Sequence, residues 1–76
     1  MDKETIFAIV ARNGLDTAES VFLVKAGTLA TAAEKEADPA KKKKLLADAK
    51  KLTKLVKALQ AAETGLNQYL TETAGL

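Results

Sequence analysis

The stretch LLADAKKLTKLVKALQAAETGL, residues 45–66, carries the clearest structural signal in this 76-residue chain. Leucine recurs at every seventh position within it, at 45, 52, 59 and 66, with Ala49, Val56 and Ala62 in between. A seven-residue apolar repeat places one stripe along an α-helix, because two helical turns take about seven residues. The spacing therefore predicts a long helix that packs along its length on other helices.

The start of this helix is marked by Asp38-Pro39. Aspartate caps helices, and proline at the first helical position has no N–H to leave unsatisfied. We therefore predict a helix over about 39–73. Gly65 leaves two interpretations open, because it either lies within this helix or ends it before a fourth helix that starts near Asn67. The leucine repeat passes through Leu66 in phase, which favours a continuous helix.

Two shorter helices are predicted before Asp38. Asn13-Gly14 is typical of a helix end, because glycine accepts the left-handed conformation that terminates helices. Asp16 with Glu19 three residues later is an acidic form of the capping box, which begins a helix. We therefore expect helices over about 3–13 and 17–37. The inward positions expected in the second are Ala18, Phe22, Ala26 (or Lys25), Leu29 and Ala33.

The fold class that follows is all-α, an antiparallel three-helix bundle with a long C-terminal helix and with a fourth helix if Gly65 breaks it. A long hairpin with a bent arm is equally consistent with the helix lengths. Strands are a weaker alternative for 5–11 and 20–24, which are rich in β-branched and aromatic residues. The capping sequence between those segments favours helices.

Composition excludes several kinds of site. The chain has no cysteine and no histidine, so disulfides, zinc clusters and imidazole catalysis are absent. The glycines have no phosphate-loop spacing, and no pair of carboxylates is placed for acid–base catalysis. We expect one domain over 1–76, no enzyme activity, no cofactor or small-molecule substrate, and no metal site. No run is long enough to span a membrane and the start Met-Asp-Lys-Glu is unlike a signal peptide, so a cytoplasmic location is expected.

Charge is divided unevenly along the chain. Residues 1–38 hold four basic and seven acidic residues, whereas residues 39–76 hold eight lysines and three acids. Such a basic segment can bind phosphate backbones, although it lacks arginine and interleaved aromatics. A solvated helix face explains it better. The lysines predicted to share one stripe, and hence to bind nucleic acid under this alternative, are Lys43, Lys50, Lys54 and Lys57.

Two short segments, 6–11 and 21–24, are apolar on every side of a helix. A single neighbouring helix cannot cover the whole circumference of either, because four consecutive residues already surround the helix axis. They form either the entire core of a monomer or a surface that binds another chain. We favour association of the chain with itself or with a partner helix, with a twofold dimer as the simplest form. The residues expected at that surface are Phe7, Val10, Leu23 and Val24.

The segment from Asp38 to Leu55 resembles the idealised helices of engineered bundles, in its Asp-Pro-Ala start and its repetition of lysine and leucine. This resemblance implies an artificial bundle as a further possibility. Asn13, Gly27 and the scarcity of glutamate after residue 38 fit that possibility less well.

Overall fold

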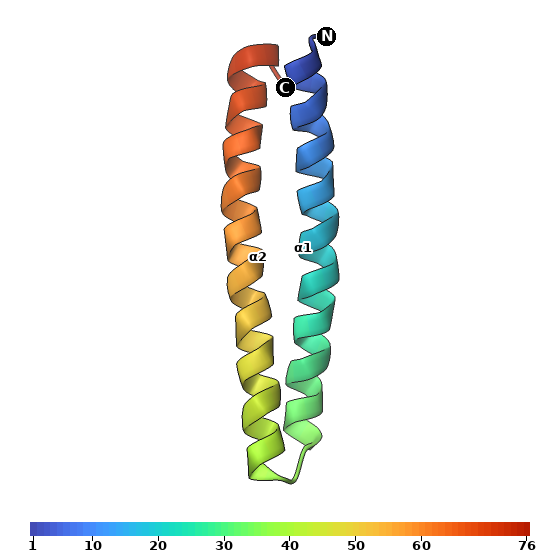
Figure 1. The fold of residues 1–76 in the computed structure, drawn as a ribbon, viewed down its shortest axis with the longest axis vertical. Helices are drawn as coiled ribbons and strands as arrows, with labels where there is room; N and C mark the ends of the chain where they lie inside the picture. The colour runs from blue at the N-terminus through green and yellow to red at the C-terminus, as the bar shows by residue number, and fades with distance from the viewer.

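Two long antiparallel helices joined by a short connection make up the protein (Figure 1). The computed structural model describes all residues 1–76, with α1 over Lys3–Lys35 and α2 over Pro39–Ala74. Both chain termini lie at one end of the resulting rod, and the connection lies at the other (Figure 1). The rod measures 55 × 14 × 14 Å. The predicted all-α class is confirmed.

The starts of both helices follow from the aspartates that precede them. The Asp2 side chain accepts the Thr5 N–H at 2.7 Å, and the Asp38 side chain accepts the Ala40 N–H at 2.9 Å. Each bond satisfies a backbone donor that the first turn of a helix otherwise leaves free. Pro39 is the first residue of α2, as predicted from Asp38-Pro39.

The end of α2 depends on a glycine that the sequence analysis did not single out. Gly75 adopts the left-handed conformation, with φ of 69°. The N–H groups of Gly75 and Leu76 donate to the carbonyl oxygens of Thr71 and Leu70, at 3.1 and 3.3 Å. This arrangement satisfies carbonyls that the last helical turn leaves without partners.

The predicted helix end at Asn13-Gly14 is wrong, because α1 runs without interruption through residues 14–16. A glycine inside a helix costs only about 1 kcal/mol, which packing along a long neighbour can outweigh. The hydroxyls of Thr17 and Ser20 donate to the carbonyls of Asn13 and Asp16, at 3.1 and 3.2 Å, as helix-interior hydroxyls do. The separate helices predicted over 3–13 and 17–37 are therefore one straight arm.

Gly65 does not break α2, so the continuous interpretation is confirmed and the short fourth helix is not formed. The chain contributes two helices instead of three, and the hairpin that was an alternative to the bundle is observed, without its bend. The sequence predicts one helix too many because Asn13-Gly14 has the residue types of a helix end, whereas the backbone stays helical there.

The contact between the helices follows one stripe on each, which we call the seam. Its positions are separated alternately by three and four residues, the spacing that keeps one side of a helix against a neighbour. Every seam residue is buried or half-buried. The seam residues of α1 are Thr5, Ala8, Arg12, Leu15, Glu19, Phe22, Ala26, Leu29 and Ala33, and those of α2 are Leu45, Ala49, Leu52, Val56, Leu59, Glu63, Leu66 and Leu70.

The seam confirms the predicted leucine repeat at 45, 52, 59 and 66, and it confirms Phe22, Ala26, Leu29 and Ala33 as inward positions. Alanine at four seam positions, 8, 26, 33 and 49, allows close approach of the two backbones there. Only six apolar residues are buried, and four of them are alanines. A hairpin of two helices hides one stripe of each, so the rest of each circumference stays in contact with solvent.

The accessible surface of the hairpin is correspondingly large. It measures 5418 Å², whereas a compact protein of this mass exposes about 4,450 Å² by the usual scaling with mass. The chain thus exposes about 970 Å² more than a compact monomer of its size. Neither helix contains a segment both long enough and apolar enough to cross a bilayer.

Candidate functional site

A second stripe runs along α1 on the side turned away from α2. Each of its positions lies two residues from a seam position, which is a rotation of about 200° around the helix. All of its residues are exposed and none carries a charge. We call this the outer stripe; it consists of Phe7, Val10, Gly14, Thr17, Val21, Val24, Thr28 and Thr31.

The outer stripe contains three of the four residues that the sequence predicted at a partner-binding surface. Phe7 is 60% exposed, Val10 62% and Val24 71%. Side chains of this type are usually buried in folded proteins, so several in one row form an unusual surface. The 3-4 spacing of the stripe matches that of the seam. A partner helix laid along α1 would therefore meet the same geometry that α2 meets on the other side.

Leu23 is exposed as well, but the structure does not place it with the other three predicted residues. It belongs to the row that contains Asp16 and Ala30, and this row borders the seam. Consecutive residues diverge by about 100° on a helix, so Leu23 and Val24 point in different directions. A run of apolar residues does not show which of Leu23 and Val24 faces away from the neighbouring helix, because that depends on the side of α1 on which α2 packs.

The lysines of the alternative function are all exposed on α2. Lys43, Lys50, Lys54 and Lys57 lie outside the seam of α2, and the 3.6-residue period turns them away from its leucines. The predicted shared lysine stripe is thus consistent with the observed helix.

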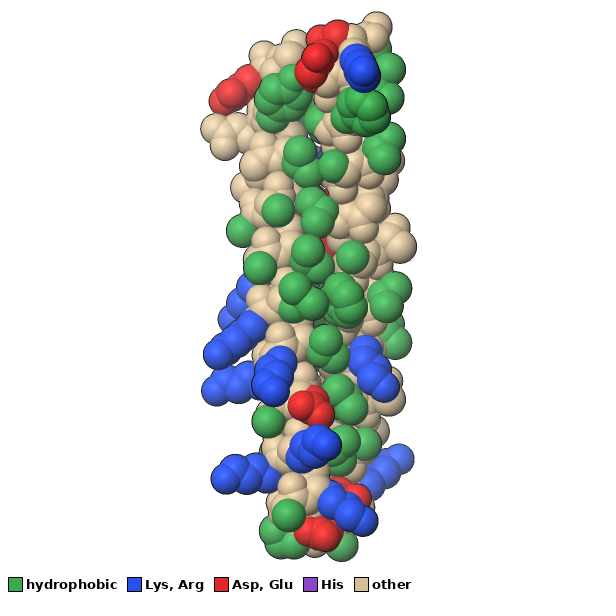
Figure 2. All heavy atoms as spheres, viewed as in Figure 1, with side chains coloured by type: hydrophobic (Ala, Val, Ile, Leu, Met, Phe, Trp, Pro, Cys, Tyr) green, Lys and Arg blue, Asp and Glu red, His purple; other side chains and the backbone are tan.

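Charge is polarised along the rod. The half that contains the connection, residues 20–57, holds ten lysines and four acidic residues, a net charge of +6. The half that contains the termini, residues 1–19 and 58–76, holds two basic and six acidic residues, a net charge of −4. Figure 2 shows most of the Lys and Arg side chains of the visible face gathered over the connection half. The two ends of the molecule are therefore electrostatically complementary to each other.

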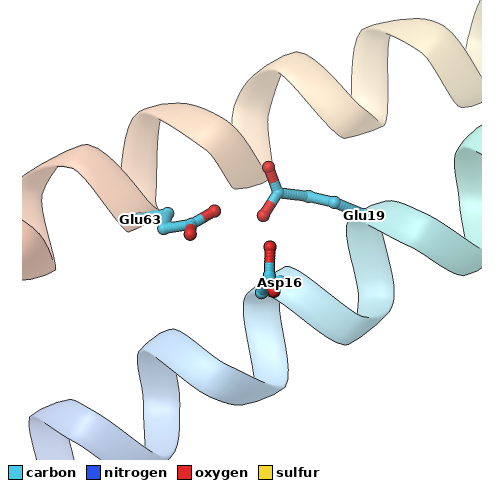
Figure 3. Close-up of side chains that lie close together, drawn as sticks. All are labelled: Asp16, Glu19 and Glu63. Carbon is cyan, nitrogen blue, oxygen red and sulfur yellow. The ribbon is translucent and has the colours of Figure 1, made fainter.

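Three carboxylates meet at the seam near the middle of the rod, where the acidic half borders the basic one (Figure 3). Asp16 and Glu19 extend from α1 and Glu63 from α2, with one oxygen of each within 4.8 Å of the others. Asp16 is exposed, Glu63 half-buried, and Glu19 only 7% exposed. The buried oxygen Oε2 of Glu19 has no hydrogen-bond partner. We call these residues the carboxylate cluster.

The cluster raises the pKa of Glu19 from 4.5 to about 7. The main cause is a hydrogen bond shared with Glu63, which requires a proton on one of the two side chains; desolvation and the negative charges of Glu63 and Asp16 act in the same direction. The ionised form of Glu19 is disfavoured in the folded state, so the cluster favours binding of a proton or another cation.

Stability is expected to fall between about pH 5 and pH 8 as Glu19 ionises. Its pKa is higher in the folded chain than in the unfolded one, so its stabilising effect is complete below pH 4.5 and is lost as pH rises through about 7. The Asp2 carboxyl does not add to this pH dependence, because the hydrogen bond from Thr5 lowers its pKa below 3.8. Thermal unfolding followed by circular dichroism should give a lower Tm at the higher pH. Glu19→Gln should flatten this dependence, and an unchanged slope in that variant would contradict the assignment.

Sequence reasoning missed the carboxylate cluster because it assigned Asp16 and Glu19 to a helix start. The signal was available in the spacing, since Glu19 and Glu63 both fall at core positions of a 3-4 repeat once α1 is taken as continuous. Their meeting across the seam required the register between the helices.

No pocket was found in the hairpin. The chain matches no protein-family model, and neither the curated proteins nor the solved structures that were searched include a match to it.

Proposed function

We propose that this chain is a non-catalytic assembly module in which two copies associate through their outer stripes, α1 against α1, in an antiparallel and twofold-symmetric arrangement. The observation that carries the proposal is the outer stripe of α1, whose residues are all exposed and uncharged and are spaced alternately by three and four positions. Two hairpins joined in this way contain four helices in total, with coiled-coil packing between the two central ones.

The excess surface of the hairpin supports a second copy as the occupant. A stable interface of standard size removes about 800 Å² from each partner, and the chain exposes about 970 Å² beyond a compact protein of equal mass. Pairing on the outer stripe would cover exposed apolar side chains such as Phe7 and Val24. Burial of such side chains is the main favourable contribution to association.

Charge polarisation supports the antiparallel orientation. When two copies pair head to tail, the +6 half of each lies beside the −4 half of the other. A parallel pair places like charges together along the whole rod, which is unfavourable at moderate ionic strength. The midpoint of α1 is near residue 19, so full antiparallel overlap places Thr17 beside Val21 of the other copy and Phe7 beside Thr31.

The mass in solution tests the association. Sedimentation across a dilution series should give twice the 8.0 kDa chain mass at high concentration. The double variant Val10→Glu/Val24→Glu should sediment as a monomer, because it places buried negative charge in the proposed interface. Lys54→Glu is the matched control, since it changes net charge by the same two units on α2. A monomeric wild-type chain, or equal dissociation in both variants, would contradict the proposal.

Cysteine pairing tests the orientation, and the chain offers a background free of native cysteine. Under oxidation, Thr17→Cys should form a disulfide with Val21→Cys in mixed samples, and Phe7→Cys with Thr31→Cys. Phe7→Cys alone should stay reduced in an antiparallel pair, since its two copies lie at opposite ends. Rapid self-pairing of Phe7→Cys would indicate a parallel dimer instead.

Nucleic-acid binding through Lys43, Lys50, Lys54 and Lys57 is a second candidate, favoured by the net charge of +6 on the connection half. Its affinity should fall steeply as salt is added, because bound phosphates release counterions. Apolar association should hold or strengthen in the same salt series. Lys50→Glu/Lys54→Glu would abolish the first activity and spare the second.

A further inference from the structure

The seam contains one polar atom whose environment is unexplained by packing. Glu19 is more than nine-tenths buried, its carboxylate is directed toward Asp16 and Glu63, and its Oε2 has no hydrogen-bond partner (Figure 3). A buried acceptor without a donor is costly, and a buried charge without a counter-charge costs more. Glu19 nevertheless occupies a seam position of α1, where an alanine or leucine side chain would pack without this cost.

Basic side chains do not supply the missing charge. Arg12 is the other charged seam residue of α1, and its Nη1 donates to Oδ1 of Asn67 on α2 at 3.4 Å. The charged groups that act on the Glu19 carboxyl are both acidic, Asp16 on its own helix and Glu63 on the facing one. The cluster therefore carries up to three negative charges, and a proton or a metal ion has to balance them.

We infer that Asp16, Glu19 and Glu63 bind a calcium ion that links α1 to α2. All three contribute carboxylate oxygens, which are the ligands of hard divalent cations. Ligand oxygens on opposite sides of Ca²⁺ lie about 4.6–5.2 Å apart, so separations within 4.8 Å fit one such ion without rearrangement of the helices. Mg²⁺ demands near-ideal octahedral geometry and gives up its water molecules reluctantly, so three side chains from two helices suit it less well than the more adaptable Ca²⁺.

The placement of the three residues suits this role. Glu19 and Glu63 come from opposite helices, so an ion between them joins the two arms at the seam. Asp16 is exposed and leaves a path from solvent, from which water molecules complete the coordination.

Calorimetric titration of the full chain with CaCl₂ at about pH 8 tests the site. We expect one ion per chain with Kd on the order of 10⁻⁴–10⁻³ M, the range of weak sites with few ligands. Calcium should also raise Tm by several degrees, because it binds only the folded hairpin. MgCl₂ should bind more weakly than CaCl₂ and should raise Tm less at equal concentration.

Glu19→Gln and Glu63→Gln should each reduce calcium affinity at least tenfold, while Glu34→Gln, which alters an exposed carboxylate of α1 outside the cluster, should leave it unchanged. Binding should persist in Val10→Glu/Val24→Glu, so the site is tested separately from association. Tm shifts reproduced by NaCl at equal ionic strength, or equal binding in all three Gln variants, would overturn the inference. Tighter binding of Mg²⁺ than Ca²⁺ would overturn the assignment to calcium.

Discussion

Leu70→Ala is expected to lower the free energy of unfolding by about 2–5 kcal/mol. Leu70 is fully buried at the seam, with 0% exposure, and is the largest side chain buried to that degree. Truncation removes its burial and leaves a cavity that two helices cannot close without losing register. A domain of this size has a stability of only about 4–11 kcal/mol, so the variant should lose a large part of it.

Leu46→Ala is the matched control for this prediction, because it makes the same chemical change on the same helix at a side chain that is 48% exposed. It should change stability by about 0.5 kcal/mol or less, as most surface substitutions do. Urea denaturation of the wild type and both leucine variants measures the two effects. The protein concentration must be the same in all three samples, because association makes the apparent stability depend on it. Equal losses in Leu70→Ala and Leu46→Ala would show that the seam has been assigned to the wrong face of α2.

Thr17→Pro is expected to cost about 3 kcal/mol or more. In the continuous α1, Thr17 is an interior position, so proline removes a backbone hydrogen bond and its ring clashes with the carbonyl of Asn13. If a helix began at Thr17, as the capping pattern predicted, proline would occupy a first helical position, where it is favoured. The variant therefore distinguishes one helix from two by the size of its effect.

Thr17→Ala controls for the loss of the threonine side chain. It removes the hydroxyl bond to Asn13 but keeps the backbone N–H, and alanine has the higher helix propensity. We expect unchanged or slightly higher helicity by circular dichroism for Thr17→Ala, and a clear loss for Thr17→Pro. Full helicity and stability in Thr17→Pro would contradict the uninterrupted α1.

The candidate surfaces differ in how far residue patterns could locate them. The apolar runs of the sequence contain Phe7, Val10 and Val24, and the structure leaves all three side chains exposed. The same runs could not exclude Leu23 from the stripe, because a run of apolar residues contains no information on which side the neighbour lies. The carboxylate cluster was not predicted, since its residues are 44 positions apart, from Glu19 to Glu63.

Local chemistry was sufficient for the helical class, for the start of α2 at Pro39 and for the leucine stripe of α2, because caps and apolar periodicity act within a few turns of the chain. The continuity of α1 through Gly14 depended on tertiary packing. A glycine costs about 1 kcal/mol in a helix, and only contact with α2 along its whole length decides whether that cost is outweighed. Register across the seam likewise decided that Glu19 faces Glu63, because pairing between distant residues follows from how two helices pack and not from either helix alone.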